Sequence, residues 1–191
     1  DFDIADAIFG FGHNPGINHP RRLVTFREES RRGGNIVAIN PLKERGLERF
    51  QDPQAAVAMM TNGSTPISRY YFQPNVGGDY ALMFGMLKHL REWDIQALAA
   101  GKKSVFDRSF IEMNTVGFDA MMEEIDRTTW SDIHAHTGLS PEHLESLAKM
   151  YLDAKTAIFC WGMGITQHRH GTANVHMLAN LMLARGHIGR S

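Results

Sequence analysis

The order of short apolar runs in the first 43 residues strongly limits the folds open to this chain. Ala7–Gly12 is apolar without alternation, which is typical of a strand buried on both faces. The polar turn His13–Pro20 follows, then a helical pattern over Arg21–Arg32 and a second apolar run, Ile36–Ile39, which ends in Asn40–Lys43. Strand, helix, strand in this order predicts a parallel βαβ unit with a right-handed crossover.

The expected helix over Arg21–Arg32 has clear boundary signals. Pro20 is expected at its first position, where a missing N–H costs nothing, and Gly33 directly follows its last turn. We expect Leu23, Val24 and Phe26 on its apolar side.

A second strand and glycine turn lie near the end of the chain. Thr156–Cys160 is a β-branched and aromatic run, and Trp161–His168 follows it directly with glycines at 162 and 164. Glycines let the backbone turn sharply and approach a ligand closely. Because ligands of open α/β sheets bind at the carboxyl ends of the strands, this turn is a candidate site.

The remaining chain is mainly helical by pattern. We expect an extended piece over 67–72 and helices over 54–60, 76–93, 107–114, 119–126, 130–136, 140–154 and 172–185. The 54–60 helix is expected to begin with Asp52 as its cap and Pro53 at its first position. Together these patterns predict one three-layer α/β/α domain over residues 1–191, with a parallel Rossmann-like sheet.

Composition excludes several classes of function. A net charge of −1 gives no electrostatic reason to expect nucleic acid or an anionic membrane as a partner. No apolar run approaches the roughly 20 residues that span a bilayer. Cys160 is the only cysteine, so we expect a buried, inert thiol and no multi-cysteine metal centre. We also expect a cytoplasmic location, and Trp161 within the core.

Four segments are candidates for a ligand edge. The turns Gly12–Asn18, Asn40–Lys43 and Gly162–His168 each follow a strand, and Val76–Asp79 opens a helix, where free N–H groups favour anions. They indicate a nucleotide-like ligand, although neither G-x-G-x-x-G nor a phosphate loop is present. From the residues alone, Asp79 is most simply a helix N-cap.

Two other motifs leave similar alternatives. Asn14-Pro15 could be a plain turn. His168-Arg169-His170 could bind a metal, but neighbouring positions do not direct two imidazoles to one face, so a polar loop is the favoured interpretation. No nucleophile–base pair that would suit a hydrolase is evident.

Taken together, the motifs resemble the catalytic subunits of molybdopterin oxidoreductases in the dimethyl sulfoxide reductase family, especially the formate-dehydrogenase-like branch. They occur in that family's order along nearly the whole chain. The matching stretches are Gly12–Pro20, Ile36–Leu42, Val76–Leu82, Asp107 with Phe110-Ile111, Thr115–Phe118, Trp161–His168, Asn180-Leu181 and Gly186–Arg190.

The resemblance implies a cofactor and a division of labour. Such subunits bind molybdenum or tungsten through two molybdopterin guanine dinucleotides. The resemblance identifies this chain as an excised central α/β domain that embraces one dinucleotide. It places the iron–sulfur cysteines and the metal-ligating residue before Asp1, and a barrel-like domain after Ser191. The expected partners are therefore the other domains of the parent subunit and an electron-transfer subunit, and the chain alone is expected to hold no catalytic residue or metal and to be inactive.

The resemblance also implies roles for individual residues. Asp79 matches the acidic residue that accepts hydrogen bonds from guanine. Asn40 and Leu42 match the strand end beside the ribose, where many members carry Asp and Arg, and Lys43 is the candidate replacement. The full implied set is Gly12, His13, Asn14, Pro15, Asn18, His19, Asn40, Leu42, Lys43, Gly77, Gly78, Asp79, Gly162, Met163, Gly164 and Gln167.

Two other kinds of function remain open. The chain could be a non-catalytic structural domain related to the family, although an empty site has no need of the glycine turns and Asp79. It could also belong to an unrelated nucleotide-binding transferase, against which the absent phosphate loop argues.

Overall fold

A computed structural model describes residues 2–189 and divides the chain into two compact units. Unit 1 comprises Asp1–Gln73 and Thr156–Ile165, and unit 2 comprises Pro74–Lys155 and Thr166–Ser191. The single domain expected over residues 1–191 stays a prediction. Arg190, the last residue of one family-like stretch, lies outside the described residues, as do Asp1 and Ser191.

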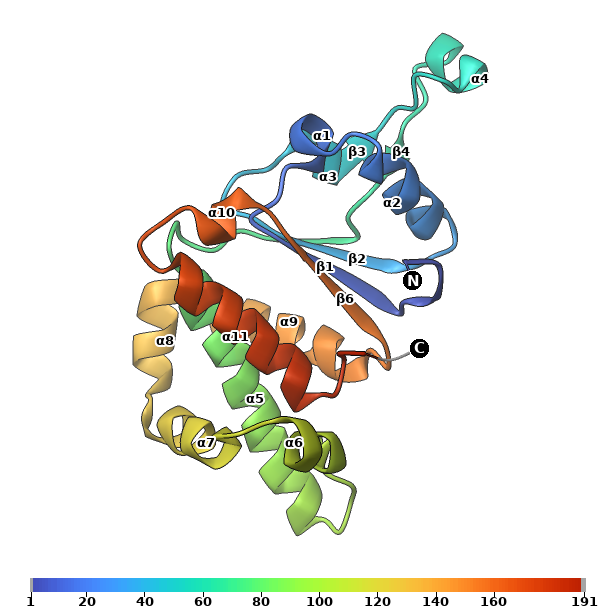
Figure 1. The fold of residues 1–191 in the computed structure, drawn as a ribbon. Helices are drawn as coiled ribbons and strands as arrows, with labels where there is room; N and C mark the ends of the chain where they lie inside the picture. The colour runs from blue at the N-terminus through green and yellow to red at the C-terminus, as the bar shows by residue number, and fades with distance from the viewer. Residues whose placement is uncertain (1, 190–191) are drawn as a thin grey trace. The chain divides into compact units, whose positions relative to one another are not determined.

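Unit 1 is built on a four-stranded parallel sheet (Figure 1). Its strands are β1 (Ala7–Phe11), β2 (Asn35–Ile39), β5 (Tyr70–Phe72) and β6 (Ala157–Trp161), in the spatial order β5-β2-β1-β6. Phe9 of β1 lies between Val37 of β2 and Phe159 of β6 in the register. The predicted α/β class is confirmed. The three predicted strands are confirmed as well, and they pair in parallel.

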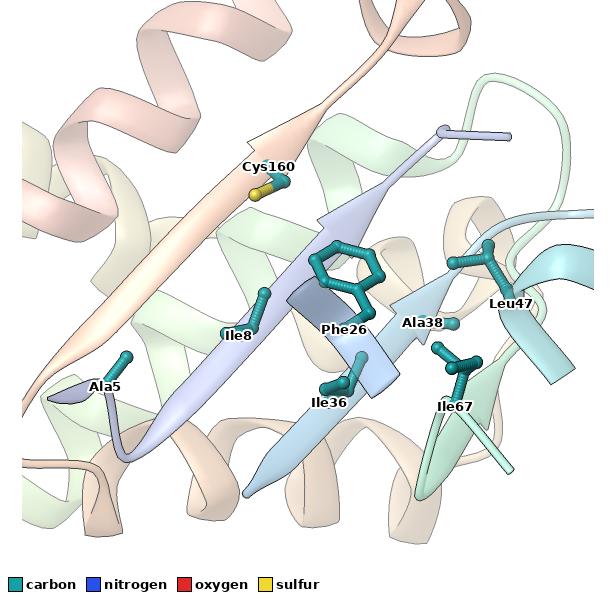
Figure 2. Close-up of a cluster of buried hydrophobic side chains, with 8 residues drawn as sticks. All are labelled: Ala5, Ile8, Phe26, Ile36, Ala38, Leu47, Ile67 and Cys160. Carbon is teal, nitrogen blue, oxygen red and sulfur yellow. The ribbon is translucent and has the colours of Figure 1, made fainter. Parts of the chain in front are cut away.

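A cluster of buried side chains holds helix α2 (Arg22–Arg31) against one face of this sheet (Figure 2). Alternate residues of each strand point to the same face, so Ile36 and Ala38 of β2 both face Phe26 of α2. Burying a side chain of Phe26's size contributes roughly 1.5–3 kcal/mol. The cluster consists of Ala5, Ile8, Phe26, Ile36, Ala38, Leu47, Ile67 and Cys160.

Short elements complete unit 1. They are η1 (Phe2–Ile4), α1 (Pro15–Asn18), α3 (Arg45–Glu48), β3 (Arg49–Phe50), α4 (Ala56–Met60) and β4 (Thr65–Pro66). Strands β3 and β4 pair antiparallel, and α4 lies at the tip of the arm that they begin (Figure 1). Helix α10 (Met163–Thr166) is a single turn where a glycine turn was expected, and it crosses from unit 1 into unit 2.

Unit 2 is helical. Its helices are α5 (Asp79–Ala99), α6 (Arg108–Asn114), α7 (Phe118–Arg127), α8 (Trp130–Thr137), α9 (Pro141–Asp153) and α11 (Gly171–Ala184). The central helix α5 contacts α7, α8, α9 and α11. Among the described residues, the sequence pattern located every one of these helices, although α5 begins three residues later and ends six residues later than predicted. Among residues 2–189, no helix has both the length and the apolarity needed to cross a membrane.

Several local predictions were wrong. Pro20 precedes α2 instead of opening it, and the cap of α4 is Ala55, not Asp52. Val24 and Trp161 are 42% and 38% exposed, so neither belongs to the core. Asp52 cannot cap α4 because its carboxylate pairs with Arg27 and accepts the N–H of Gln54. Cys160 is buried as expected, and burial raises the pKa of its thiol.

Candidate functional site

In unit 1, the ends of β1 and β6 meet through three glycines. Gly12 has a left-handed backbone (φ +51°), and a Cβ on it would lie 3.1 Å from Gly164 C. A Cβ on Gly164 would lie 2.7 Å from the Gly12 oxygen, and one on Gly162 would lie 3.0 Å from it. All of these neighbours are backbone atoms, so side chains are excluded from the crossing. The edge is thus shaped by backbone, as the two predicted turns required.

Asn14 and Pro15 begin α1 instead of forming a plain turn. Pro15 occupies the first helical position, and the Asn14 side chain accepts the N–H of Ile17 at 3.2 Å. The Asn14 amide also donates to Glu44 Oε2 at 2.6 Å. Both ends of the amide are therefore engaged with protein. Asn18 is the last residue of α1 and is exposed.

His13 and His19 form an imidazole pair beside this crossing. His13 is only 2% exposed, and its Nε2 lies 3.3 Å from Nδ1 of the exposed His19. Burial, and then the charges of Arg22 and His19, lower the pKa of His13 to about 4. The His13 ring is therefore neutral near pH 7, and the pair is a hydrogen bond between two imidazole nitrogens.

The turn after β2 is tied together by hydrogen bonds. The buried Asn40 amide donates to the Leu42 oxygen at 2.7 Å, and the Tyr71 hydroxyl donates to the same oxygen at 2.7 Å. The hydroxyl in turn accepts the N–H of Glu44 at 3.0 Å. Leu42 and Lys43 are exposed, so their side chains are free to meet a ligand. No sequence pattern pointed to Tyr71, which joins β5 to this turn.

In unit 2, Asp79 is a buried carboxylate at the start of α5. It is 6% exposed and is the first helical residue, whereas the N-cap is Gly78, so the capping alternative is wrong. Burial raises the pKa of Asp79 above its ordinary value, opposed by its own N–H and by His168. No ion pair to Asp79 occurs within the part of the chain that the structure describes.

The two glycines before Asp79 differ in their surroundings. Gly77 is left-handed (φ +82°), and a Cβ there would meet nothing within 4 Å. A Cβ on Gly78 would lie 2.6 Å from the backbone oxygen of His136. Gly78 is therefore required by packing inside unit 2. Only Gly77 adjoins open space that a ligand could use.

The loop before α11 carries a polar cluster that sequence analysis only partly identified. His168 Nδ1 accepts the N–H of His170 at 3.3 Å, and its Nε2 lies 2.8 Å from Nδ2 of Asn174. Asn174 is fully buried. The only available signal was an amide within the apolar pattern of α11. Gln167 is exposed in the same loop, and Met163 is 59% exposed in α10.

The predicted residues thus fall into two groups. The turns at 12–19, 40–43 and 162–164 belong to unit 1, and residues 77–79 and 167 belong to unit 2. Within unit 1, Gly12 meets Gly162 and Gly164, and Asn40 follows the strand next to β1. Within the described residues, no three His, Cys, Asp or Glu side chains are grouped as metal ligands would be.

Comparison with known proteins agrees with these features. The sequence profile described as "Molybdopterin oxidoreductase" matches residues 94–191. This chain belongs to the molybdopterin oxidoreductase family, which confirms the resemblance inferred from its motifs.

Individual relatives match along the whole chain. Protein YdeP of Escherichia coli K12 is 47% identical over 190 residues, covering 100% of this chain and 25% of the relative. The assimilatory nitrate reductase of Haloferax mediterranei is 34% identical (99% and 22%), and formate dehydrogenase H of E. coli K12 is 27% identical (100% and 23%). The chain therefore spans about a quarter of the length of these curated relatives.

A solved structure shares the fold. Acetylene hydratase from Pelobacter acetylenicus superposes with a TM-score of 0.76 at 16% identity, over 99% of this chain and 22% of that protein. At this identity, the similarity concerns the fold alone.

Proposed function

We propose that this chain is the part of a longer, formate-dehydrogenase-like oxidoreductase that holds one molybdopterin guanine dinucleotide. The family and the relatives four times its length support this proposal. The bound molybdenum or tungsten group would supply the two-electron chemistry, and the protein would bind and orient it. On this proposal the iron–sulfur and metal-ligating residues lie outside the chain. An electron-transfer subunit, the neighbouring domains and a cytoplasmic location belong to the same proposal.

The observation that carries the proposal is the environment of Asp79. A buried carboxylate needs a compensating partner, because burial of an unpaired charge is costly. Asp79 makes no ion pair among residues 2–189, although His168 lowers its pKa somewhat, and it follows two residues after Gly77, which adjoins open space. Its two oxygens are acceptors suited to adjacent N–H donors, such as N1 and N2 of guanine. The site therefore fits the guanine end of the cofactor.

The strand edge of unit 1 fits the phosphate-bearing part of such a cofactor. Backbone atoms of Gly12 and Gly164 approach each other too closely for any side chain. The N–H groups of Gly12 and Gly162 are bound to the oxygens of Ile39 and Phe11, so what the crossing offers is backbone that a ligand could approach without steric hindrance from side chains. The residues of this chain would thus bind and orient, and none is assigned a chemical step, so we propose that the isolated chain has no turnover.

The test is cofactor retention by Asp79 variants of the intact protein. We expect Asp79→Asn and Asp79→Ala each to weaken binding by about one to two orders of magnitude, since charge-assisted hydrogen bonds contribute roughly 1.5–3 kcal/mol. The asparagine amide would turn one donor toward a donor of guanine. Guanine dinucleotide content after dialysis is the measurement.

A matched control separates recognition from helix electrostatics. Asp119 is an exposed acid in the first turn of α7, so Asp119→Asn should leave cofactor content unchanged. Full retention of the cofactor by Asp79→Asn would reject the guanine role and leave Asp79 a structural residue.

A further inference from the structure

The His13–His19 pair connects the buried strand edge with an open cavity. His13 directly follows the left-handed Gly12, and a Cβ on Gly162 would lie 3.3 Å from His13 Cδ2. On the other side of the pair, His19 lines an open cavity of about 1070 Å³ together with Arg21 and Arg22. One ring is thus fixed within the protein, and the other is available to a ligand.

The arrangement determines where the ring protons lie. A hydrogen bond between two imidazole nitrogens uses one N–H, so either His13 Nε2 or His19 Nδ1 is the donor. His13 Nδ1 is buried and has no hydrogen-bond partner within the described residues. If His19 donated, His13 would have to carry its proton on that buried Nδ1, and an orphaned N–H is rarer than a bare acceptor. His13 therefore donates from Nε2, and His19 carries its proton on Nε2.

The charges around the pair favour an anion. Arg22 and Arg21 lie at the start of α2 and line the same cavity as His19. Asp52 is the one acidic residue in that lining, and Arg27 already neutralises it. Two other groups do not form a competing site for a cation. Glu44 accepts a hydrogen bond from the Asn14 amide, and Cys160 on β6 is a thiol whose pKa is raised by burial.

We propose that His19 donates its Nε2–H to a phosphate oxygen of the ligand, and that His13 is the positioning residue that fixes His19 in this tautomer. The inference rests on the proposed function, because it assigns the phosphate-bearing part of the ligand to the strand edge of unit 1. Arg21 and Arg22 would attract the phosphate by their positive charge, and the ring pair would orient one hydrogen bond toward it. His13 itself would not touch the ligand.

Ring-nitrogen NMR of the intact, cofactor-free protein tests the tautomers. With ¹⁵N-labelled histidine at pH 7, we expect both rings protonated on Nε2 and bare on Nδ1. His13→Leu and His19→Gln assign the signals. In His13→Leu, the His19 signals should move toward a mixture of tautomers, and His13→Gln should restore them, because its amide keeps a donor. A proton on His19 Nδ1 in the unaltered protein would overturn the proposal without any variant.

Binding of inorganic pyrophosphate and of GDP, measured by calorimetry, tests the ligand role. We expect His19→Gln to weaken pyrophosphate about tenfold and His13→Leu about threefold, with His13→Gln near the unaltered value. His176, an exposed residue of α11, provides the control, and His176→Gln should change nothing. GDP bound more tightly than pyrophosphate would identify the dinucleotide as the phosphate source, and equal affinities would identify a free phosphate.

The failures are distinguishable. If pyrophosphate does not bind, or binds equally to His19→Gln, the role of the histidine pair is refuted. Cofactor retention by Asp79→Asn would instead refute the guanine site, whatever the histidines do.

Discussion

The two units shape their polar regions mainly by different means, although unit 1 also buries His13, Glu29 and Asn40. In unit 1, the strand edge is formed by backbone, because Gly12, Gly162 and Gly164 leave no room for side chains. In unit 2, charged and amide side chains are buried within the helical packing. These are Asp79, Lys88, Asp94 and Asn174, none of them more than 8% exposed.

This contrast shows where each unit is vulnerable. A tight backbone crossing is destabilised when an atom is added to it. A buried polar network is destabilised when one of its hydrogen-bonding atoms is removed. Asp94 illustrates the second case, since it accepts hydrogen bonds from Ser104 Oγ (2.5 Å), the N–H of Val105 (2.7 Å) and Arg108 (2.6 Å). Although burial acts to raise the pKa of Asp94, these bonds together hold it below its ordinary value.

The largest expected effect is that of Asp94→Ala. It would leave several donors around a fully buried position without an acceptor, at a cost of about 3 kcal/mol in unfolding free energy. Urea denaturation measures the loss. As a control, Asp153→Ala breaks the exposed Lys149–Asp153 pair and should cost under about 0.5 kcal/mol. Equal losses in the two variants would show that unit 2 does not depend on its buried network.

Gly164→Ala should have the next largest effect, in unit 1. The new methyl group would lie 2.7 Å from the Gly12 oxygen and 3.1 Å from its Cα, so the backbone must move, at about 2 kcal/mol. The control is Gly10→Ala in β1, where the nearest atom is 3.9 Å away. Thermal unfolding of both variants is the measurement, and a silent Gly164→Ala would contradict the tight crossing of β1 and β6.

The sequence predicted the elements of both units better than it predicted their contacts. Strands β1 and β6 were predictable because parallel strands buried on both faces are short, continuous apolar runs. The last six residues of α5, 94–99, were not, because Asp94 looks like a polar helix end until its partners at 104–108 are known. The start of α4 was missed for a similar reason, since Asp52 binds Arg27, 25 residues away, instead of capping. Long-range polar partners leave no periodic signal.

The candidate site was predicted at the level of its turns. The glycines at 12 and 164 and the acid at 79 were all identified from local patterns and the family resemblance. The reason for Gly78 was not, because it depends on the oxygen of His136 in a different helix. The role of Tyr71 was also invisible, since a tyrosine in a strand looks like core and its hydroxyl partners lie near residue 43.

The smallest expected effect concerns Asp79 in the cofactor-free protein, and it compares Asp79 with Asp94 directly. The folded protein raises the pKa of Asp79, so the folded state holds this proton more tightly than the unfolded chain does. Stability must then fall as pH rises from the ordinary value of 3.8 through the raised pKa. Asp79→Asn lacks this titration, so relative to the unaltered protein it should gain a small amount of stability between pH 4 and pH 7. Urea denaturation at both pH values measures the difference.

Asp94, whose pKa is lowered, should show the opposite sign, with its contribution to stability lost toward low pH. A relative loss of stability in Asp79→Asn at pH 7 would mean that groups of the protein stabilise the Asp79 carboxylate, as they stabilise that of Asp94. The carboxylate would then need no ligand as a partner.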